Sequence, residues 1–226
     1  MAKTIEFEPK FITFDCYGTL TNFSEMGGLA RTIFSDRLQG EELERFVQLF
    51  SGYRFDEVLG PYKPYDEVLF NAIKRTCERT GIAFSKEEGE QFYKAVPTWG
   101  PWPDVPEGLR RLATKYKLVI LSNTNDEIIM SNVEKLGAPF HAVFTAQQAQ
   151  SYKPRMPGFE YMFEKLGCKP EDVLHVSASM EYDLQTAEGM GIKHKVFVNR
   201  KKAPVKAAFH YYEVDGIEAL ATALGL

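Results

Sequence analysis

Five short apolar segments, separated by longer amphipathic ones, are the feature of this sequence that most limits its fold. Each segment is made of β-branched, aliphatic or aromatic residues and gives way abruptly to polar ones. Strands that are apolar along their whole length are typical of a parallel sheet that helices cover on both faces. The segments lie at residues 11–14, 118–121, 143–144, 173–176 and 196–198.

The amphipathic segments between these strands predict the helices that connect them. Three of the segments end beside a glycine, Gly137, Gly167 or Gly191, as helix C-termini often do. Alternating strands and helices predict a doubly wound, Rossmann-like α/β fold. The predicted helices cover residues 107–116, 127–136, 158–166 and 184–190.

The interval from residue 22 to residue 100 has a different pattern. It contains helical periodicity at residues 41–50, 66–80 and 86–94 and almost no strand-like run. Proline, glycine and aromatic residues cluster at its C-terminal end. We predict a helical cap subdomain at 22–100, inserted into an α/β core made of 1–21 and 101–226.

Composition excludes several classes of protein. The chain has 226 residues, with 27 Lys and Arg against 31 Asp and Glu, and its net charge is -4. This balance argues against a nucleic-acid partner, since the one basic run is Arg200-Lys201-Lys202. No apolar run approaches the roughly 20 residues that span a membrane, and the N-terminus lacks the apolar segment of a signal peptide. Three widely spaced cysteines predict neither a disulfide framework nor a zinc site, so we expect a cytoplasmic protein.

Polar residues follow the predicted strands. Asp15 follows the first, Ser122 and Asn123 end the second, and a loop leading to Asp183 follows the fourth, while Lys153 precedes a predicted helix. Each residue alone is typical of a turn or a helix cap. Because the carboxyl ends of parallel strands meet at one edge of a sheet, their coincidence predicts one ligand-binding crevice.

These residues belong to four segments that resemble, in order, the four motifs of the haloacid dehalogenase superfamily. The segments lie at residues 14–20, 121–123, 152–154 and 175–183. The first, with Tyr17, Gly18 and Thr19 after Asp15, is most similar to that of the type II 2-haloacid dehalogenases. The resemblance covers about residues 11–200. It implies a homodimeric enzyme that converts short (S)-2-haloalkanoic acids to 2-hydroxy acids.

The resemblance also implies the catalytic residues. Asp15 would attack the carbon that bears the leaving group and form an ester, which water then hydrolyses. Lys153 would keep Asp15 ionised and stabilise negative charge on the ester oxygen. Thr19 would donate a hydrogen bond to Asp15, and Asp183 would either orient Lys153 or activate the water.

Substrate contacts follow from the same resemblance. Ser122 and the backbone N–H groups of Cys16 and Tyr17 would bind the substrate carboxylate, and Asn123 would face the leaving group. A cap arginine receives the halide in such enzymes. Here either Arg45 or Arg54 could be that residue.

Departures from the phosphatases of the superfamily argue against a metal ion. Those enzymes have a second Asp where this chain has Tyr17, and an acidic ligand where, counting back from Asp183, this chain has Ala178. Because Mg²⁺ prefers several carboxylate ligands, we predict no metal ion and no cofactor, which makes a Mg²⁺-dependent phosphatase the weaker alternative.

Other departures leave the leaving group open. By the same count Ala178 and Met180 stand where related dehalogenases flank the water with Ser and Asn, and Phe159 stands where a Tyr is usual. An enzyme that opens a cyclic amino acid such as azetidine-2-carboxylate would use the same nucleophile. The joint presence of Asp15, Lys153 and Asp183 argues against a non-catalytic binding protein. His175, inside a predicted strand, is typical of a core residue.

Overall fold

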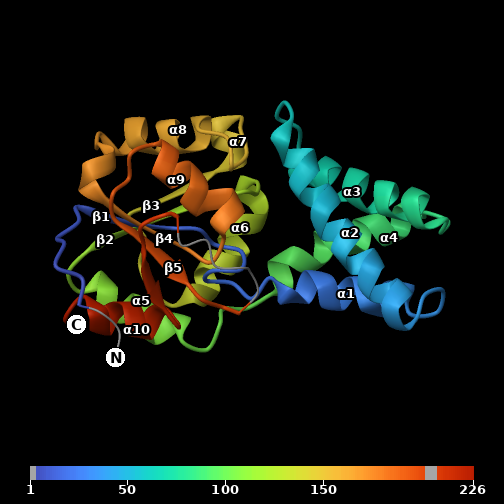
Figure 1. Cartoon of the computed structure of the whole chain (residues 1–226), viewed down its shortest axis with the longest axis horizontal. Coiled ribbons are helices and arrows are strands. Elements are labelled where there is room, and N and C mark those ends of the chain that lie inside the picture. The colour runs from blue at the N-terminus through green and yellow to red at the C-terminus, as the bar shows by residue number, and fades with distance from the viewer. Residues whose placement is uncertain (1–3, 202–207) are drawn as a thin grey trace. The chain divides into compact units, whose positions relative to one another are not determined.

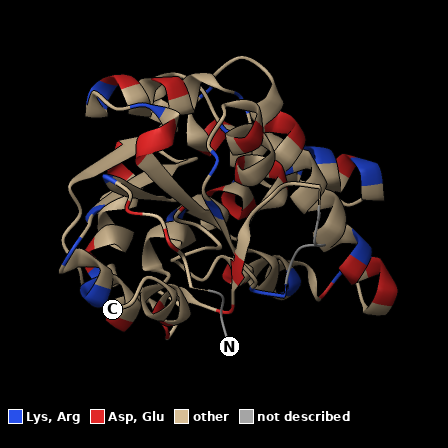
Figure 2. Cartoon of the chain, turned by 60° about the vertical axis from the view of Figure 1, so that its left-hand side comes forward, with Lys and Arg blue, Asp and Glu red and all other residues tan. Residues whose placement is uncertain are grey.

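The computed structural model describes residues 4–201 and 208–226, which separate into two compact units (Figure 1). One unit consists of Met1–Asn22 and Gly100–Leu226, and the other of Phe23–Trp99. The first three residues and Lys202 of the basic run lie outside the described residues. Lys and Arg positions are interspersed with Asp and Glu along the helices of both units (Figure 2).

Within the described residues, six parallel strands form the sheet of the first unit, in the order β3-β2-β1-β4-β5-β6. The chain runs outward from β1 to β3 and returns to β4 on the other side of β1. Open α/β sheets bind ligands where the direction of winding reverses in this way. The strands are β1 (Phe11–Phe14), β2 (Lys117–Ser122), β3 (Ala142–Thr145), β4 (Val173–Ser177), β5 (Lys195–Val198) and β6 (Tyr212–Val214).

Helices cover both faces of this sheet, so the predicted doubly wound fold is confirmed. Helices α5 (Val105–Ala113) and α10 (Ile217–Ala223) bury their apolar side chains against one face, and α8 (Pro157–Leu166) and α9 (Gln185–Gly189) against the other (Figure 1). Side chains of α6 (Asp126–Val133) join the first of these two clusters. The short helix α7 is Ala146–Ala149, and 3-10 turns lie at Glu134–Leu136 and Pro170–Asp172.

The second unit is the helical insertion. It contains α1 (Ser24–Phe34), α2 (Gly40–Leu59), α3 (Tyr65–Thr80) and α4 (Lys86–Ala95), followed by a 3-10 turn at Val96–Thr98. Aromatic rings pack between the helices: the centroids of Phe34 and Phe46 are 4.3 Å apart, and those of Phe50 and Phe92 are 4.9 Å apart.

Helix α2 continues nine residues past the predicted end at residue 50. Ser51 and Gly52 are weak helix formers, but contacts distant in sequence stabilise the last turns. The buried carboxylate of Glu57 accepts hydrogen bonds from Lys63 and from Arg75, the latter at 2.7 Å. Local periodicity does not contain these contacts, so the prediction for this helix end was wrong.

Four of the labelled helices and strands were not predicted: α1, α7, β6 and α10. Strand β6 has three residues and pairs with β5 through Val196 and Tyr212, so its register comes from its neighbour. Helix α10 packs closely on α5, where a Cβ atom on Gly108 would lie 2.5 Å from the backbone nitrogen of Glu218. Of the helices described, none is both long and apolar enough to cross a membrane.

Candidate active site

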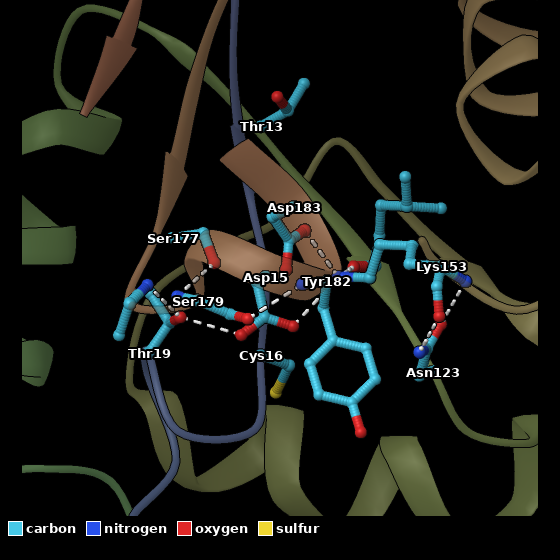
Figure 3. A network of polar contacts seen from close by, with 12 residues as sticks. Thr13, Asp15, Cys16, Thr19, Asn123, Lys153, Ser177, Ser179, Tyr182 and Asp183 are labelled. Atoms are coloured by element: carbon cyan, nitrogen blue, oxygen red, sulfur yellow. Dashed lines mark hydrogen bonds and ion pairs between the residues drawn. The ribbon is translucent and has the colours of Figure 1, made fainter. Parts of the chain in front are cut away.

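Asp15 lies directly after β1, at the point where the winding of the sheet reverses. Its N–H donates to the carbonyl oxygen of Val176 at 3.0 Å, which extends the pairing of β1 with β4 by one residue. Its carboxylate oxygen Oδ2 accepts a 2.7 Å hydrogen bond from the hydroxyl of Thr19, and that hydroxyl accepts one from the N–H of Ala178 at 2.8 Å (Figure 3). The first and fourth motifs therefore hold each other in place.

Lys153 carries the positive charge of the site. Its side chain is 2% exposed, and its ammonium donates to Asp15 Oδ1 at 2.9 Å, to Asp183 Oδ1 at 2.7 Å and to the carbonyl oxygen of Leu121 at 2.8 Å. An ammonium has three donors, so all three are used. One buried lysine therefore joins two buried carboxylates that lie far apart in the sequence.

Burial and neighbouring charges set the pKa values of these groups. Burial raises the pKa of Asp15, and the charge of Asp183 raises it further, against the opposing effects of Lys153 and Thr19. Burial would also raise the pKa of Asp183, but Lys153 and His175 hold it below its usual range. Burial would lower the pKa of Lys153, yet the two carboxylates raise it. As the pH rises, Asp15 is thus the second of the two carboxyls to lose its proton.

Asn123 fixes the backbone of Lys153. Its amide nitrogen donates to the Lys153 carbonyl oxygen at 2.8 Å, and its amide oxygen accepts from the Lys153 N–H at 2.7 Å. This pairing of a side chain with a backbone joins the second and third motifs. It leaves one N–H of the Asn123 amide for a ligand.

Asp183 has two donors on the same oxygen. Besides Lys153, the Nε2 atom of His175 lies 3.1 Å from its Oδ1 atom, and both side chains are fully buried. The other oxygen, Oδ2, has no hydrogen-bond partner among the residues that the structure describes. Sequence reasoning assigned no role in the site to His175. Its place two residues before Ser177 on β4, facing the same side of the sheet, is the signal that would have shown it.

The fourth motif contains a π-helical turn, Met180–Leu184. A π turn holds one residue more than an α-helical turn, so counting back from Asp183 does not by itself show which side chains face the site. Met180 packs with Leu184 and Phe197 in an apolar cluster. Ser177 is buried beside the site, and its hydroxyl accepts the N–H of Ser179 at 2.9 Å (Figure 3).

The predicted carboxylate-binding residues lie in the same unit as Asp15. Ser122 is buried, and its hydroxyl makes no hydrogen bond within residues 4–201 and 208–226. The Tyr17 hydroxyl donates to the side-chain oxygen of Asn132 at 2.8 Å. Cys16 is buried beside Thr21, and burial raises the pKa of its thiol to about 12, which keeps it protonated and unreactive.

The two candidate arginines lie on opposite sides of α2 in the second unit. They are nine residues apart, which is about 2.5 helical turns. Arg45 lines an open cavity of about 690 Å³ together with Arg75 and Arg79. The guanidinium of Arg54 lies over two rings, at 5.1 Å from the centroid of Phe23 and 5.0 Å from that of Phe50.

Comparison with known proteins identifies the family. Residues 9–191 match the haloacid dehalogenase-like hydrolases. The chain belongs to this family. A relative named (S)-2-haloacid dehalogenase, from Pseudomonas fluorescens, is 24% identical over 184 residues, which are 79% of each chain.

Solved structures share the fold of this hydrolase. L-2-haloacid dehalogenase from Xanthobacter autotrophicus, with chloropropionic acid covalently bound, has a TM-score of 0.79 at 20% identity, over 96% of this chain and 99% of that one. The hydrolase YfnB from Bacillus subtilis, bound to magnesium, has a TM-score of 0.81 at 18% identity, over 97% and 100%. The same fold therefore occurs with a covalently bound haloacid in one protein and with magnesium in another. The residues of the site, and not the fold, must decide the chemistry.

Metal ligands are one such criterion. Across the described part of the chain, no group of three or more His, Cys, Asp or Glu side chains is arranged to hold a metal ion. Between Asp15 and Asp183 lies the ammonium of Lys153, a fixed positive charge. That the protein needs no metal remains a prediction, tested below.

We predict that Lys153→Met makes the stability of the protein depend on pH. Without the ammonium, the pKa values of Asp15 and Asp183 rise above their values in the unfolded chain. Such carboxyls stabilise the fold at low pH, and this stabilisation is lost as the pH rises through their folded-state pKa. The variant should therefore lose about 3–5 kcal/mol near neutral pH and less in acid, as measured by urea unfolding across pH.

A matched control is Lys115→Met, because Lys115 is an exposed lysine that pairs with Glu8 at 2.6 Å. Its free energy of unfolding should stay within about 0.5 kcal/mol of the original at every pH. Wild-type stability of Lys153→Met at neutral pH would show that the buried carboxylates do not depend on this lysine.

Proposed function

We propose that this hydrolase converts short (S)-2-haloalkanoic acids to 2-hydroxy acids through an aspartyl ester, without a metal ion. The observation that carries the proposal is the contact of one buried lysine with two carboxylates of unequal exposure. The side chain of Asp15 is 10% exposed and that of Asp183 is 0% exposed, so Asp15 is the carboxylate that can meet a substrate. The names of the relatives support the same reaction.

In the first step, a carboxylate oxygen of Asp15 attacks C2 of the substrate. A C–O bond forms while the carbon–halogen bond breaks, and the halide leaves with the bonding electrons, so the configuration at C2 inverts. Asp15 must be ionised to attack. Lys153 and Thr19, each bonded to a different oxygen of the carboxylate, favour that ionised form and restrict its orientation.

In the second step, water attacks the carbonyl carbon of the ester. Asp183 takes up the proton of the water through its open oxygen, Oδ2, while Lys153 stabilises the negative charge on the tetrahedral intermediate. Cleavage of the bond between the carbonyl carbon and the substrate oxygen regenerates Asp15. The 2-hydroxy acid takes the proton from Asp183 and leaves with an oxygen that came from Asp15, and the second proton of the water leaves the Asp15 carboxyl for solvent. Loss of a donor such as Lys153 commonly costs about 10²–10³ in rate.

The substrate carboxylate needs hydrogen-bond donors, and the candidates lie at the end of β2 and in the loop after Asp15. We assign the binding of this carboxylate to the Ser122 hydroxyl and the backbone N–H groups of Cys16 and Tyr17. The buried Ser122 hydroxyl, which bonds to nothing in the described parts of the chain, supports this assignment, because buried polar groups normally have a partner. A small carboxylic acid would supply it.

For the departing halide we assign Arg54 and the remaining N–H of Asn123. The guanidinium of Arg54 is held over the rings of Phe23 and Phe50, which restricts its orientation. Arg45 points to the other side of α2, into a cavity lined by residues of α2 and α3. We therefore choose Arg54, whose guanidinium two rings orient, over Arg45, and the substitutions below decide between the two.

The proposal extends to the state of the protein in the cell. We propose a cytoplasmic homodimer. The three cysteines, all free of disulfides, support a reducing compartment. The dimer rests on the resemblance to the type II dehalogenases, and gel filtration with light scattering tests it.

A single turnover in H₂¹⁸O tests the covalent step. With enzyme in excess over (S)-2-chloropropionate and after treatment with EDTA, we expect unlabelled lactate and enzyme that carries ¹⁸O at Asp15. The reason is that the product hydroxyl comes from the carboxylate, which regains its oxygen from water. Mass spectrometry of the lactate and of the peptide with Asp15 measures both.

The control for this experiment is Asp15→Asn, which should keep the fold and release no chloride because an amide is a poor nucleophile. Label in the lactate from the first turnover would instead show that Asp15 acts as a general base. Activity that EDTA abolishes and Mg²⁺ restores would contradict metal independence.

A substrate panel tests the leaving group. We expect chloride release from (S)-2-chloropropionate and little from its (R) enantiomer, since inversion at a chiral carbon requires one approach to the nucleophile. Azetidine-2-carboxylate and p-nitrophenyl phosphate should remain intact, measured by amino-acid analysis and absorbance. Ring opening without dehalogenation would show that the substrate is a cyclic amino acid and not a haloacid. Release of phosphate in the presence of Mg²⁺ would show that the substrate is a phosphate ester.

Substitution of the two arginines distinguishes their roles. Arg54→Met should lower kcat/KM for (S)-2-chloropropionate about tenfold to a hundredfold, as expected for loss of a charged hydrogen-bond donor. Arg45→Met is its matched control on the same helix and should change kcat/KM by about twofold or less. The reverse result would place Arg45 at the halide.

A further inference from the structure

His175 is a buried polar side chain to which the steps above give no part. It lies in the middle of β4, is 0% exposed, and packs edge-on against the ring of Phe159 with the ring centroids 5.1 Å apart. An imidazole in such a place needs partners for both nitrogens. It has them in Thr13 and Asp183.

The hydrogen bonds of His175 determine which nitrogen carries the proton. An ionised Asp183 has no proton to give, so Nε2 must be the N–H that donates to it across 3.1 Å. In the neutral ring Nδ1 is then an acceptor, and the hydroxyl of Thr13 lies 2.8 Å from it. Thr13 stands opposite His175 in the pairing of β1 with β4, so the rigid sheet sets the position of the ring.

This donor has a consequence for Asp183. A carboxylate held by Lys153 alone could rotate about its terminal torsion and present either oxygen to the ammonium, because this torsion is soft. A second donor from the sheet, on the same oxygen Oδ1, opposes that rotation. Oδ2 therefore remains the oxygen that has no partner among the described residues.

We propose that His175 is a positioning residue for the hydrolysis of the ester, which it assists by keeping one oxygen of Asp183 open to the attacking water. The inference rests on the proposed function. It separates the two half-reactions, because attack by Asp15 on the substrate uses Lys153 and Thr19 and does not need the open oxygen of Asp183. His175 should therefore affect the second step and leave the first nearly unchanged.

Two substitutions of His175 test this separation. His175→Leu removes both ring nitrogens, whereas His175→Gln retains an amide N–H at about the position of Nε2. On rapid mixing with excess (S)-2-chloropropionate, His175→Leu should release a burst of chloride equal to the enzyme concentration. Turnover should then be slower by about tenfold to a hundredfold, with the ester visible as an adduct by intact mass spectrometry. His175→Gln should accumulate less ester.

The pH dependence of the second step is an independent readout. The charged or titratable groups that contact Asp183 are Lys153 and His175, and Asp15 shares the same ammonium. Loss of the His175 donor should raise the pKa of Asp183. The acid limb of ester hydrolysis in His175→Leu should therefore move to higher pH, while that of chloride release keeps its position.

Phe159→Leu is the matched control, because it reduces the packing around the imidazole and leaves both of its hydrogen bonds in place. It should lower the melting temperature without causing the ester to accumulate. If His175→Leu does not fold, two milder variants serve instead. Thr13→Val removes the hydroxyl behind the ring, and His175→Gln retains one donor. Each should accumulate ester, in smaller amounts than expected for His175→Leu.

The outcomes distinguish a failure of the role of His175 from a failure of the proposed function. Chloride release by His175→Leu with ester hydrolysis at the wild-type rate would overturn the role of His175 alone, as would equal slowing of both steps. If the wild-type protein releases no chloride from any 2-haloacid, the proposed function fails, and the role of His175 in it fails as well.

Discussion

The contact of one buried ammonium with two buried carboxylates is the interaction on which the site depends. Two carboxylates and one lysine leave a net negative charge inside the protein, and such a charge is costly unless every group is hydrogen-bonded. The surrounding residues meet this condition for Lys153 with three acceptors and for Asp15 with two donors. Because the partners come from all four motifs, the site cannot form until the sheet and its connecting loops are in place.

The same constraint assigns different tasks to two residues of the same type. Asp15 is buried but keeps 10% of its side chain exposed, and it is the second carboxyl to ionise, as suits a nucleophile that meets the substrate. Asp183 is fully buried, and Lys153 and His175 keep its pKa low, so it stays ionised and can orient the lysine. Environment and not residue type separates these tasks.

Some elements of the fold were predictable from the sequence and others were not, and each case has its own physical reason. Strands β1, β2 and β4 were predictable because each is buried on both faces and is therefore apolar at most of its positions. The end of α2 was not, because the contacts of Glu57 with Lys63 and Arg75 stabilise it from a distance. Strand β6, with three residues and a charged one at its centre, carries too little pattern to be seen alone.

The sequence by itself determined the fold class and the set of residues at the strand ends, because apolar strands with polar ends need only local pattern and the known geometry of parallel sheets. Only the tertiary structure decided how those residues meet. Registry between β1 and β4 places Thr13 beside His175, a π turn sets the direction of the residues before Asp183, and the amide of Asn123 holds the backbone of Lys153. Each of these depends on atoms 30 or more positions apart or on the extra residue of one helical turn, and neither periodicity nor spacing along the chain carries that information.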